Sequence, residues 1–255
     1  HGNDIPFAEK IFAEGDSFGE VAKPNPRTDG LAPFVLRRLE LMEGRMAASG
    51  HKHRFAVARG PLNIAGFLMG NTEFLVNMKL DPDQTHALLE TVTAYLVDWL
   101  RLQKETLPEI DGILLLDDVA GFVGPEDFQV FAKPHLTRAF AAFDASVRFF
   151  HNDAPGLVCA PHLAEIGVNL FNFSHEHPMA EMQGLVGGEV ALLGNIPPRD
   201  VLARGTAADV ADCTKTLLDS LADKRRVLFS CGGGMPPDVS TENIEAFVKV
   251  VQGTG

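Results

Sequence analysis

Residues 147–156 read VRFFHNDAPG, and this stretch decides the fold class. The run 147–150 has the apolar character of a buried strand, and it stops at His151 and Asp153, just before Pro155. Because side chains alternate along a strand, His151 and Asp153 are expected on the same side of the chain. Ligands of α/β proteins collect outside the carboxyl ends of parallel strands. The stretch therefore predicts a strand that delivers a histidine and a carboxylate to a functional edge.

The same pattern recurs along the chain, where apolar runs end in polar residues or glycine. These runs are 55–58, 112–116, 168–173, 190–193 and 227–229. Helical periodicity separates them, most clearly from the N-cap candidate Asp81 and Pro82 up to Pro108. Helices are also predicted over 31–47 and 207–221. Strands that alternate with helices predict a parallel sheet covered by helices.

Two architectures satisfy this alternation: a doubly wound open sheet and a (β/α)8 TIM barrel. The early strand-to-helix turns lack a G-x-G-x-x-G or Walker-type phosphate loop, which weakens the nucleotide-binding alternative. Polar residues at the ends of many successive strands favour the barrel. About six strands can be counted, two short of closure, so we expect the N-terminal barrel strands to lie upstream. Residues 1–255 are predicted to form one domain, with a loop and helix region over 1–54 and barrel elements over 55–255.

Composition narrows the class of protein. A chain of 255 residues with 45% hydrophobic content can bury one large core. The net charge of -12 opposes phosphate backbones, so nucleic acid is not an expected partner. No apolar run approaches the ~20 residues of a membrane span. Three widely spaced cysteines do not predict a disulfide framework, and a cytoplasmic location away from membranes is expected.

An ordered set of short motifs carries a family resemblance. The motifs are Gly60-Pro61 with Ile64-Ala65-Gly66, Leu116–Gly121 (LDDVAG), Pro125–Phe128 (PEDF), Gly194–Pro198 (GNIPP), Gly234–Pro237 (GMPP) and Glu242–Ile244 (ENI). In this order and spacing the chain resembles the uroporphyrinogen decarboxylase superfamily. That resemblance implies a distorted (β/α)8 barrel. It also implies one of two enzyme classes: cofactor-independent decarboxylases, or zinc-dependent methyltransferases that serve a corrinoid or a thiol.

The motif positions favour the methyltransferase-like branch. Decarboxylases of the superfamily carry a histidine inside a Gly-His-Gly turn at the last strand, where this chain has Gly233. The methyltransferases resemble one another in a His-x-Cys pair and a second cysteine in the last glycine turn. This chain keeps His151, has Asp153 in place of the first cysteine, and has Cys231 two residues before the second position. The resemblance thus implies a zinc site of His151, Asp153 and Cys231.

The resemblance also implies the reaction, and position at the strand ends indicates the remaining site residues. We expect a cobalamin-linked methyltransferase acting on a small methoxy or thiol compound, with the corrinoid as co-substrate or on a partner protein, and a homodimer as a candidate assembly. Asp117 is expected to accept a hydrogen bond from a ligand residue or to bind the metal itself. Asn195 is expected to donate a hydrogen bond to the substrate. His175 or His177 is expected to act as an acid or base. Gly232–Gly234 are expected to cradle a phosphate or corrinoid tail through backbone N–H groups.

Other interpretations remain open at this stage. The enzyme could be a uroporphyrinogen decarboxylase or a relative acting on a tetrapyrrole, or the chain could be a non-catalytic module that binds a corrinoid or tetrapyrrole. Each candidate residue also has a structural alternative. His151 and Asp153 could hydrogen-bond each other, and Cys231 could be a small buried hydrophobe. Asp117 and Asp118 could cap a helical turn. His175-Glu176-His177 could be an ordinary polar loop, and Gly232–Gly234 could be a tight turn.

Overall fold

The fold was examined in a computed structural model, which describes residues 9–12, 16–154 and 157–253. Six strands are present there: β1 (Phe55–Arg59), β2 (Gly112–Leu116), β3 (Val147–Asn152), β4 (Leu170–Phe173), β5 (Ala191–Ile196) and β6 (Val227–Cys231). The main helices are α1 (Ala32–Ala48), α2 (Pro61–Met69), α3 (Asn71–Leu80), α4 (Pro82–Thr106), α5 (Pro125–Asp127), α6 (Lys133–Phe140), α7 (Leu163–Ile166), α8 (Met179–Val186), α9 (Ala207–Asp219) and α10 (Thr241–Val251). Short 3-10 or π turns cover Val119–Gly121, Phe128–Ala132, Ala160–His162 and Pro198–Ala203.

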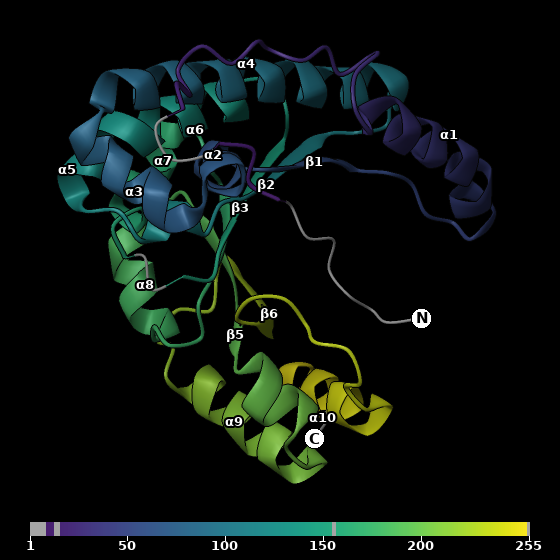
Figure 1. The fold of residues 1–255 in the computed structure, drawn as a ribbon. Helices are drawn as coiled ribbons and strands as arrows, with labels where there is room; N and C mark the ends of the chain where they lie inside the picture. Colours follow the sequence, from purple (N-terminus) through teal and green to yellow (C-terminus); the bar gives the residue numbers. More distant parts are fainter. Residues whose placement is uncertain (1–8, 13–15, 155–156, 254–255) are drawn as a thin grey trace.

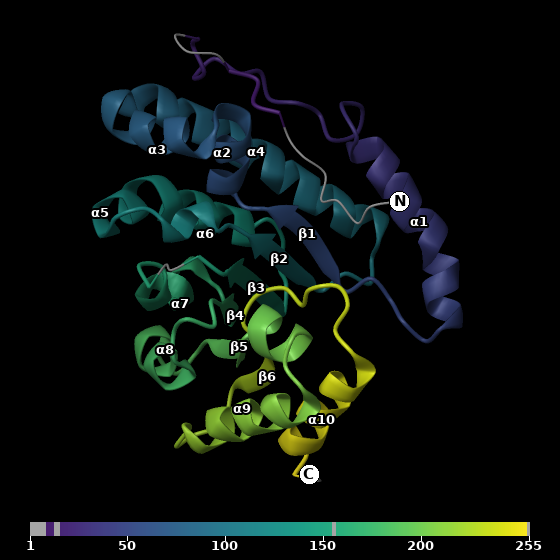
Figure 2. The ribbon, with the colours of Figure 1, turned by 60° about the horizontal axis from the view of Figure 1, so that its bottom comes forward.

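All six strands form one parallel sheet in the order β1-β2-β3-β4-β5-β6. Figure 1 shows the helices on an arc outside the strands, from α4 at the top to α9 and α10 at the bottom. Figure 2 shows the strands following one another in chain order. This sequential parallel order is that of a (β/α)8 barrel, and the sheet is open, with β1 and β6 at its edges. The predicted α/β class and every predicted strand are confirmed.

The strand register sets the position of the site. His151 on β3 is paired with Leu116 on β2 and with Asn172 on β4. Residues in one register row share a face of the sheet, so His151 and Asn172 are side-by-side neighbours. The preceding row, which contains Phe150 and Phe171, faces the other way. The outer face therefore carries the aromatic core, and the inner face carries His151 and Asn172 beside apolar side chains such as Phe149.

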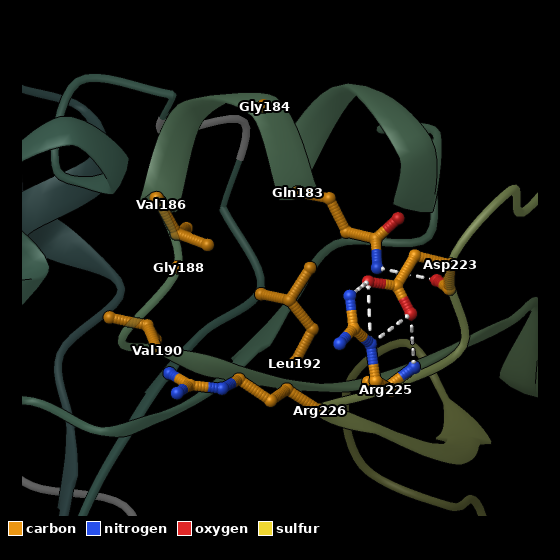
Figure 3. Close-up of a pocket in the computed structure, with 10 residues that line it drawn as sticks. Gln183, Gly184, Val186, Gly188, Val190, Leu192, Asp223, Arg225 and Arg226 are labelled. Carbon is orange, nitrogen blue, oxygen red and sulfur yellow. Dashed lines mark hydrogen bonds and ion pairs between the residues drawn. The ribbon is translucent and has the colours of Figure 1, made fainter.

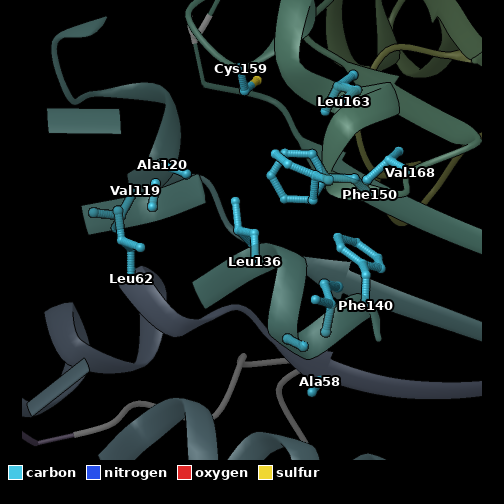
Figure 4. Packing of buried hydrophobic residues seen from close by; sticks show 14 of the residues in the cluster. Ala58, Leu62, Val119, Ala120, Leu136, Phe140, Phe150, Cys159, Leu163 and Val168 are labelled. Atoms are coloured by element: carbon cyan, nitrogen blue, oxygen red, sulfur yellow. The ribbon is translucent and has the colours of Figure 1, made fainter. Parts of the chain in front are cut away.

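The outer face of the sheet packs against the helices (Figure 4). Phe150 and Phe171 are 0% and 1% exposed, and their stacked rings lie 5.8 Å apart between centroids. Phe140 from α6 meets Phe150 edge to face. Stacked and edge-on aromatic pairs add to the stabilisation that burial of their area provides. This core fixes β3 and β4 relative to each other and so fixes the residues on their opposite face.

The predicted helix boundaries follow from local chemistry. The Asp81 side chain accepts a hydrogen bond from the backbone N–H of Gln84, and Pro82 occupies the first turn of α4. Helix α9 begins with a capping box between Thr206 and Asp209. Within the described residues, no helix combines the length and apolarity that crossing a bilayer demands. Pro155 and Gly156 of the predicted strand-end turn, and part of the 1–54 region, lie outside those residues.

Candidate active site

Three side chains converge at the carboxyl ends of β2 and β3. Asp118, His151 and Asp153 each offer one ligand atom, and these atoms lie within 4.8 Å of one another. His151 Nε2 is 3.8 Å from Asp153 Oδ2. That separation exceeds hydrogen-bond length, so the two side chains do not bond each other. The backbone N–H of Asp153 donates to Asp118 Oδ1 at 3.2 Å, which ties the two strand ends together.

A hydrogen bond at Nδ1 holds the imidazole of His151 in place. His151 Nδ1 lies 2.8 Å from Asn172 Oδ1, and the His151 side chain is 14% exposed. Asn172 is buried, and its Nδ2 group lies 2.7 Å from the Leu193 carbonyl and 3.3 Å from the Cys231 carbonyl. Asn172 thus links β3, β5 and β6 through one amide. Nε2 of His151 is left facing the two carboxylates.

A cleft of about 460 Å³ lies beside this group, and Asp118 and Asp153 form part of its lining. It is lined after β2 by Asp118 and Phe122, after β3 by Asp153, after β4 by His175 and Glu176, after β5 by Arg199 and Asp200, and after β6 by Gly232. Its volume falls in the usual range of small-molecule sites. The ends of five successive strands therefore build one concave, mainly acidic site.

Electrostatics around Asp118 distinguish it from a surface carboxylate. Burial, and then the nearby Asp153 carboxylate, raise the pKa of Asp118 above its usual range. The guanidinium of Arg59 lies 3.9 Å from Asp118 Oδ2 and offsets part of this crowding. Two carboxylates and the free side of an imidazole form a donor set that suits a divalent cation.

Asp117 has a different position from the one predicted for it. Its side chain is fully buried and accepts hydrogen bonds from the backbone N–H groups of Leu62 and Asn63, at 2.9 and 3.0 Å. These are the unpaired donors of the first turn of α2. Gly60 lies against the Asp117 carboxylate, where a side chain would not fit. The expected role of Asp117 at the mouth is therefore corrected: it caps a helix, and Asp118 lines the cleft.

Cys231 likewise lies outside the group of converging ligands. Its thiol contacts the Gly233 carbonyl at 3.4 Å, and burial raises the thiol pKa. It belongs to a small apolar cluster with Ile196, Leu202 and Val210. The expected metal role of Cys231 is thus replaced by the structural alternative, a small buried hydrophobe.

The glycine turn after β6 passes close to the site. Gly233 has a φ of 96°, and a Cβ there would lie 2.9 Å from Asp153 Oδ2. A Cβ on Gly232 would lie 2.7 Å from the backbone nitrogen of His175. The turn therefore closes one wall of the cleft by backbone alone, while its predicted phosphate or corrinoid contact stays a prediction.

The remaining predicted residues lie in the loop after β4 or brace it. His175 is exposed and lines the cleft, in a turn rather than an extended segment. The carbonyl of His177 accepts a 2.6 Å hydrogen bond from Asn195 Nδ2, and a longer one runs from the same group to the Ser174 carbonyl. The Asn195 donor group predicted to serve a substrate is thus used within the protein.

Comparison with known proteins identifies the lineage. The family profile described as "Uroporphyrinogen decarboxylase (URO-D)" matches residues 2–254. The chain belongs to the uroporphyrinogen decarboxylase family. A uroporphyrinogen decarboxylase of Thermus thermophilus is 23% identical over 86% of this chain and 64% of that protein. The methylated-thiol–coenzyme M methyltransferase of Methanosarcina mazei is 22% identical over 88% of this chain and 59% of its own length.

Solved structures agree on the fold. A methyltransferase from Methanosarcina mazei superposes with a TM-score of 0.78 at 19% identity, covering 98% of this chain and 71% of that one. A B12-independent methionine synthase from Shewanella sp. W3-18-1 gives 0.59 at 14% identity, covering 86% and 66%. The chain spans 64% of the first curated relative and 49% of a third, from Chloroherpeton thalassium. These likenesses show that the chain shares the fold of the two solved structures.

Two residues of this family member's site escape sequence reasoning. The sequence pattern names Asp118 only together with Asp117, at a strand end where either could face a ligand or cap a helical turn, and it presents Asn172 as part of an apolar strand. A signal for Asn172 exists, because it is the single polar residue in Leu170-Phe171-Asn172-Phe173. A buried amide must find hydrogen-bond partners, so a lone asparagine within a strand marks a polar contact across the sheet.

A second cavity, of about 560 Å³, lies at the opposite end of the sheet (Figure 3). Arg225 and Asp223 face each other there in a two-pronged ion pair, with Nη2 to Oδ2 at 2.8 Å, and Gln183 donates to the Asp223 carbonyl. Barrel enzymes carry chemistry at the carboxyl ends of strands, and the amino ends serve stability. This larger cavity, with its charged pair already satisfied, is therefore not the candidate active site.

Proposed function

We propose that this protein is a methyltransferase of the uroporphyrinogen decarboxylase superfamily that demethylates a small methoxy or thiol compound in a cobalamin-linked reaction. The observation that carries the proposal is the convergence of His151 Nε2 with Asp118 and Asp153 at the carboxyl ends of the strands, where the two carboxylates line a cleft. The coenzyme M methyltransferase among the curated relatives and the methyltransferase fold neighbour support it. In this proposal a corrinoid, free or on a partner protein, is the second substrate.

The donor chemistry of the site fits zinc. Imidazole and carboxylate are both zinc ligands, and three protein ligands with one open position are typical of catalytic zinc. Two carboxylates in place of thiolates leave a bound ion more electrophilic. When bound, zinc would supply Lewis-acid polarisation of the oxygen or sulfur that carries the methyl group.

The side chains around this group have separate tasks. His151 and Asp153 would hold the metal, Asp153 also lines the cleft, and the backbone of Gly232 keeps the cleft wall close. Phe122, which is 59% exposed, offers an apolar surface for the body of a small substrate. His175 lies within the same cleft and is available to exchange a proton with the demethylated product. A small organic substrate matches a cleft of about 460 Å³.

Elemental analysis and a demethylation assay test the proposal together. The purified protein should contain or take up about one equivalent of zinc, and a chelator should remove both the metal and the activity. The activity assay combines the protein with a reduced corrinoid protein and a panel of methoxy compounds and methylated thiols. Absence of demethylation across the panel, together with absence of bound metal, would overturn the proposal.

The second candidate is a decarboxylase acting on a tetrapyrrole, which the first curated relatives favour because they carry the name uroporphyrinogen decarboxylase. Turnover of uroporphyrinogen in the presence of a chelator would establish this second candidate. The glycine at position 233 argues against the decarboxylase candidate, because the decarboxylase-like pattern has a histidine there. A homodimer is proposed for either activity and is tested by measuring the mass in solution.

A further inference from the structure

We infer that Asn172 is the positioning residue of this site and that Asp118, rather than Cys231, completes its metal-binding set with His151 and Asp153. Asn172 fixes the proton of His151 on Nδ1, so that Nε2 presents a lone pair toward Asp118 and Asp153. This inference deepens the proposed function and rests on it for the identity of the metal. The tautomer of His151 does not depend on that function.

The direction of the Asn172 amide follows from its partners. Its nitrogen lies 2.7 Å from the Leu193 carbonyl and 3.3 Å from the Cys231 carbonyl, and carbonyls only accept hydrogen bonds. The nitrogen must therefore face β5 and β6, which turns the amide oxygen toward His151. If the amide oxygen and nitrogen were exchanged, the oxygen would face the Leu193 and Cys231 carbonyl oxygens, and neither contact could be a hydrogen bond. Asn172 is only 2% exposed, so water could not compensate for this loss.

The tautomer of His151 follows in turn. The Asn172 oxygen has no hydrogen to give, so the 2.8 Å contact requires Nδ1 of His151 to be the donor. In the neutral ring Nε2 then carries the lone pair. Within the described residues Nε2 has no hydrogen-bond partner, and Asp153 Oδ2 stands 3.8 Å away. An outer partner on one nitrogen that frees the other for a metal is the usual arrangement around a histidine ligand.

The choice of Asp118 over Cys231 rests on where the two side chains lie. Asp118 joins His151 and Asp153 within the 4.8 Å group and lines the cleft. The Cys231 thiol is directed to the Gly233 carbonyl and packs among apolar side chains. Two carboxylates this close, with the single Arg59 guanidinium 3.9 Å from Asp118 Oδ2, leave a local excess of negative charge that a divalent cation would neutralise.

The first test uses NMR to determine the tautomer of His151 in the metal-free protein. Two-bond ¹⁵N–¹H correlations distinguish the two neutral forms of each histidine ring, and the signal that His151→Gln removes identifies His151. The wild-type protein should show the Nδ1–H form. Asn172→Ala should convert His151 to a mixture or to the Nε2–H form. The matched control is Asn169→Ala, because Asn169 also bonds the backbone of neighbouring strands, at Arg148 and Ser146, but away from His151.

The second test measures zinc affinity against a chromophoric chelator. Asn172→Ala should weaken zinc binding about 10- to 100-fold, the usual cost of losing an outer partner, and Asn169→Ala should leave it within about twofold. Asp118→Asn should weaken it more than about tenfold, and Cys231→Ser should change it less than about threefold. The reverse ranking of the Asp118 and Cys231 variants would overturn the assigned ligand set.

The outcomes separate this inference from the proposed function. An Nε2–H ring in the wild-type protein, or an unchanged ring in Asn172→Ala, overturns the positioning role even if zinc binds. An Nδ1–H ring that Asn172 controls, in a protein that binds no zinc, upholds the positioning role and overturns the zinc-dependent function. The wild-type spectrum decides the first point even if the Asn172 variant does not fold.

Discussion

Phe150 and His151 are consecutive residues of β3, yet they lie in opposite environments. Phe150 is 0% exposed and stacks on Phe171 beneath the helices, while His151 stands on the other face beside Asn172 and the cleft. A one-residue step along a strand reverses the direction of the side chain. The outer face of the sheet is a packing surface, and the inner face carries the polar contacts and the chemistry only at the strand ends.

Stability and function are thus separated by the pleat of the strands rather than by distance along the chain. Asp117 and Asp118 repeat the lesson at the end of β2. One is fully buried as a helix cap, and the other lines the cleft. Substitutions at neighbouring positions are therefore expected to have different consequences, and such pairs offer matched controls.

The largest effect is expected at Phe150. Phe150→Ala should lower the free energy of unfolding by about 4 kcal/mol, because it leaves a cavity between α6 and the sheet. Phe149→Ala, on the half-buried inner face, should cost about half as much. Urea denaturation measures both. Equal costs would show that the two faces are packed alike and would break the comparison.

Asp117 should rank next. Asp117→Ala should lower the free energy of unfolding by about 3 kcal/mol, since the N–H groups of Leu62 and Asn63 would be left buried without an acceptor. Asp118→Ala should cost less than about 1 kcal/mol but reduce metal binding. Thermal and urea unfolding of the two variants, beside zinc titrations, check this pair. A destabilised Asp118 variant with unchanged zinc affinity would contradict the division.

A substitution of His151 should affect zinc binding strongly and stability weakly, which is the reverse of Asp117→Ala. His151→Ala should weaken zinc binding more than about 100-fold, because a ligand is lost outright, while lowering the free energy of unfolding by only about 1 to 2 kcal/mol, because the buried Asn172 oxygen loses its donor. The control is Phe150→Leu, which should keep zinc affinity within about twofold despite its position one residue away. Zinc affinity that follows stability rather than the face of the strand would refute the comparison.

The smallest effect is expected for His135, a buried histidine of α6, and it concerns how stability depends on pH. Burial lowers the pKa of His135 to about 4, and its Nδ1 lies 2.9 Å from Thr93 Oγ1. The unfolded chain takes up this proton near pH 6.5 and the folded protein only near pH 4, so His135 lowers stability as pH falls through that window. The contribution should reach about 2.5 kcal/mol by about pH 4.5.

His135→Asn should flatten this pH dependence, because an amide does not titrate. The measurement is the difference in unfolding free energy between about pH 7 and about pH 4.5 for the wild-type protein and the variant. His51→Asn, at an exposed position, is the control and should leave the slope as it is. An unchanged slope in the His135 variant would show that this ring is hydrated in the folded protein.

Sequence alone determined the elements and the lineage. Apolar runs that end in polar residues located all six strands, the Asp81 and Pro82 signals placed the start of α4, and the ordered motifs indicated the family that the profile then matched. These features are local, because strand period, caps and turn residues act over a few neighbouring positions. His151 and Asp153 were found for the same reason, since two-residue spacing on a strand fixes a common side.

Only the tertiary structure decided which partners meet His151. Asn172 faces it because β3 and β4 pair in one register across 21 residues of chain, and Asp118 joins it because Asp117 is turned away to cap α2. Cys231 is directed to a backbone carbonyl by its own turn. Contacts between strands depend on register and on the direction of each Cα–Cβ bond at a strand end, and neither quantity is encoded by spacing along a single segment.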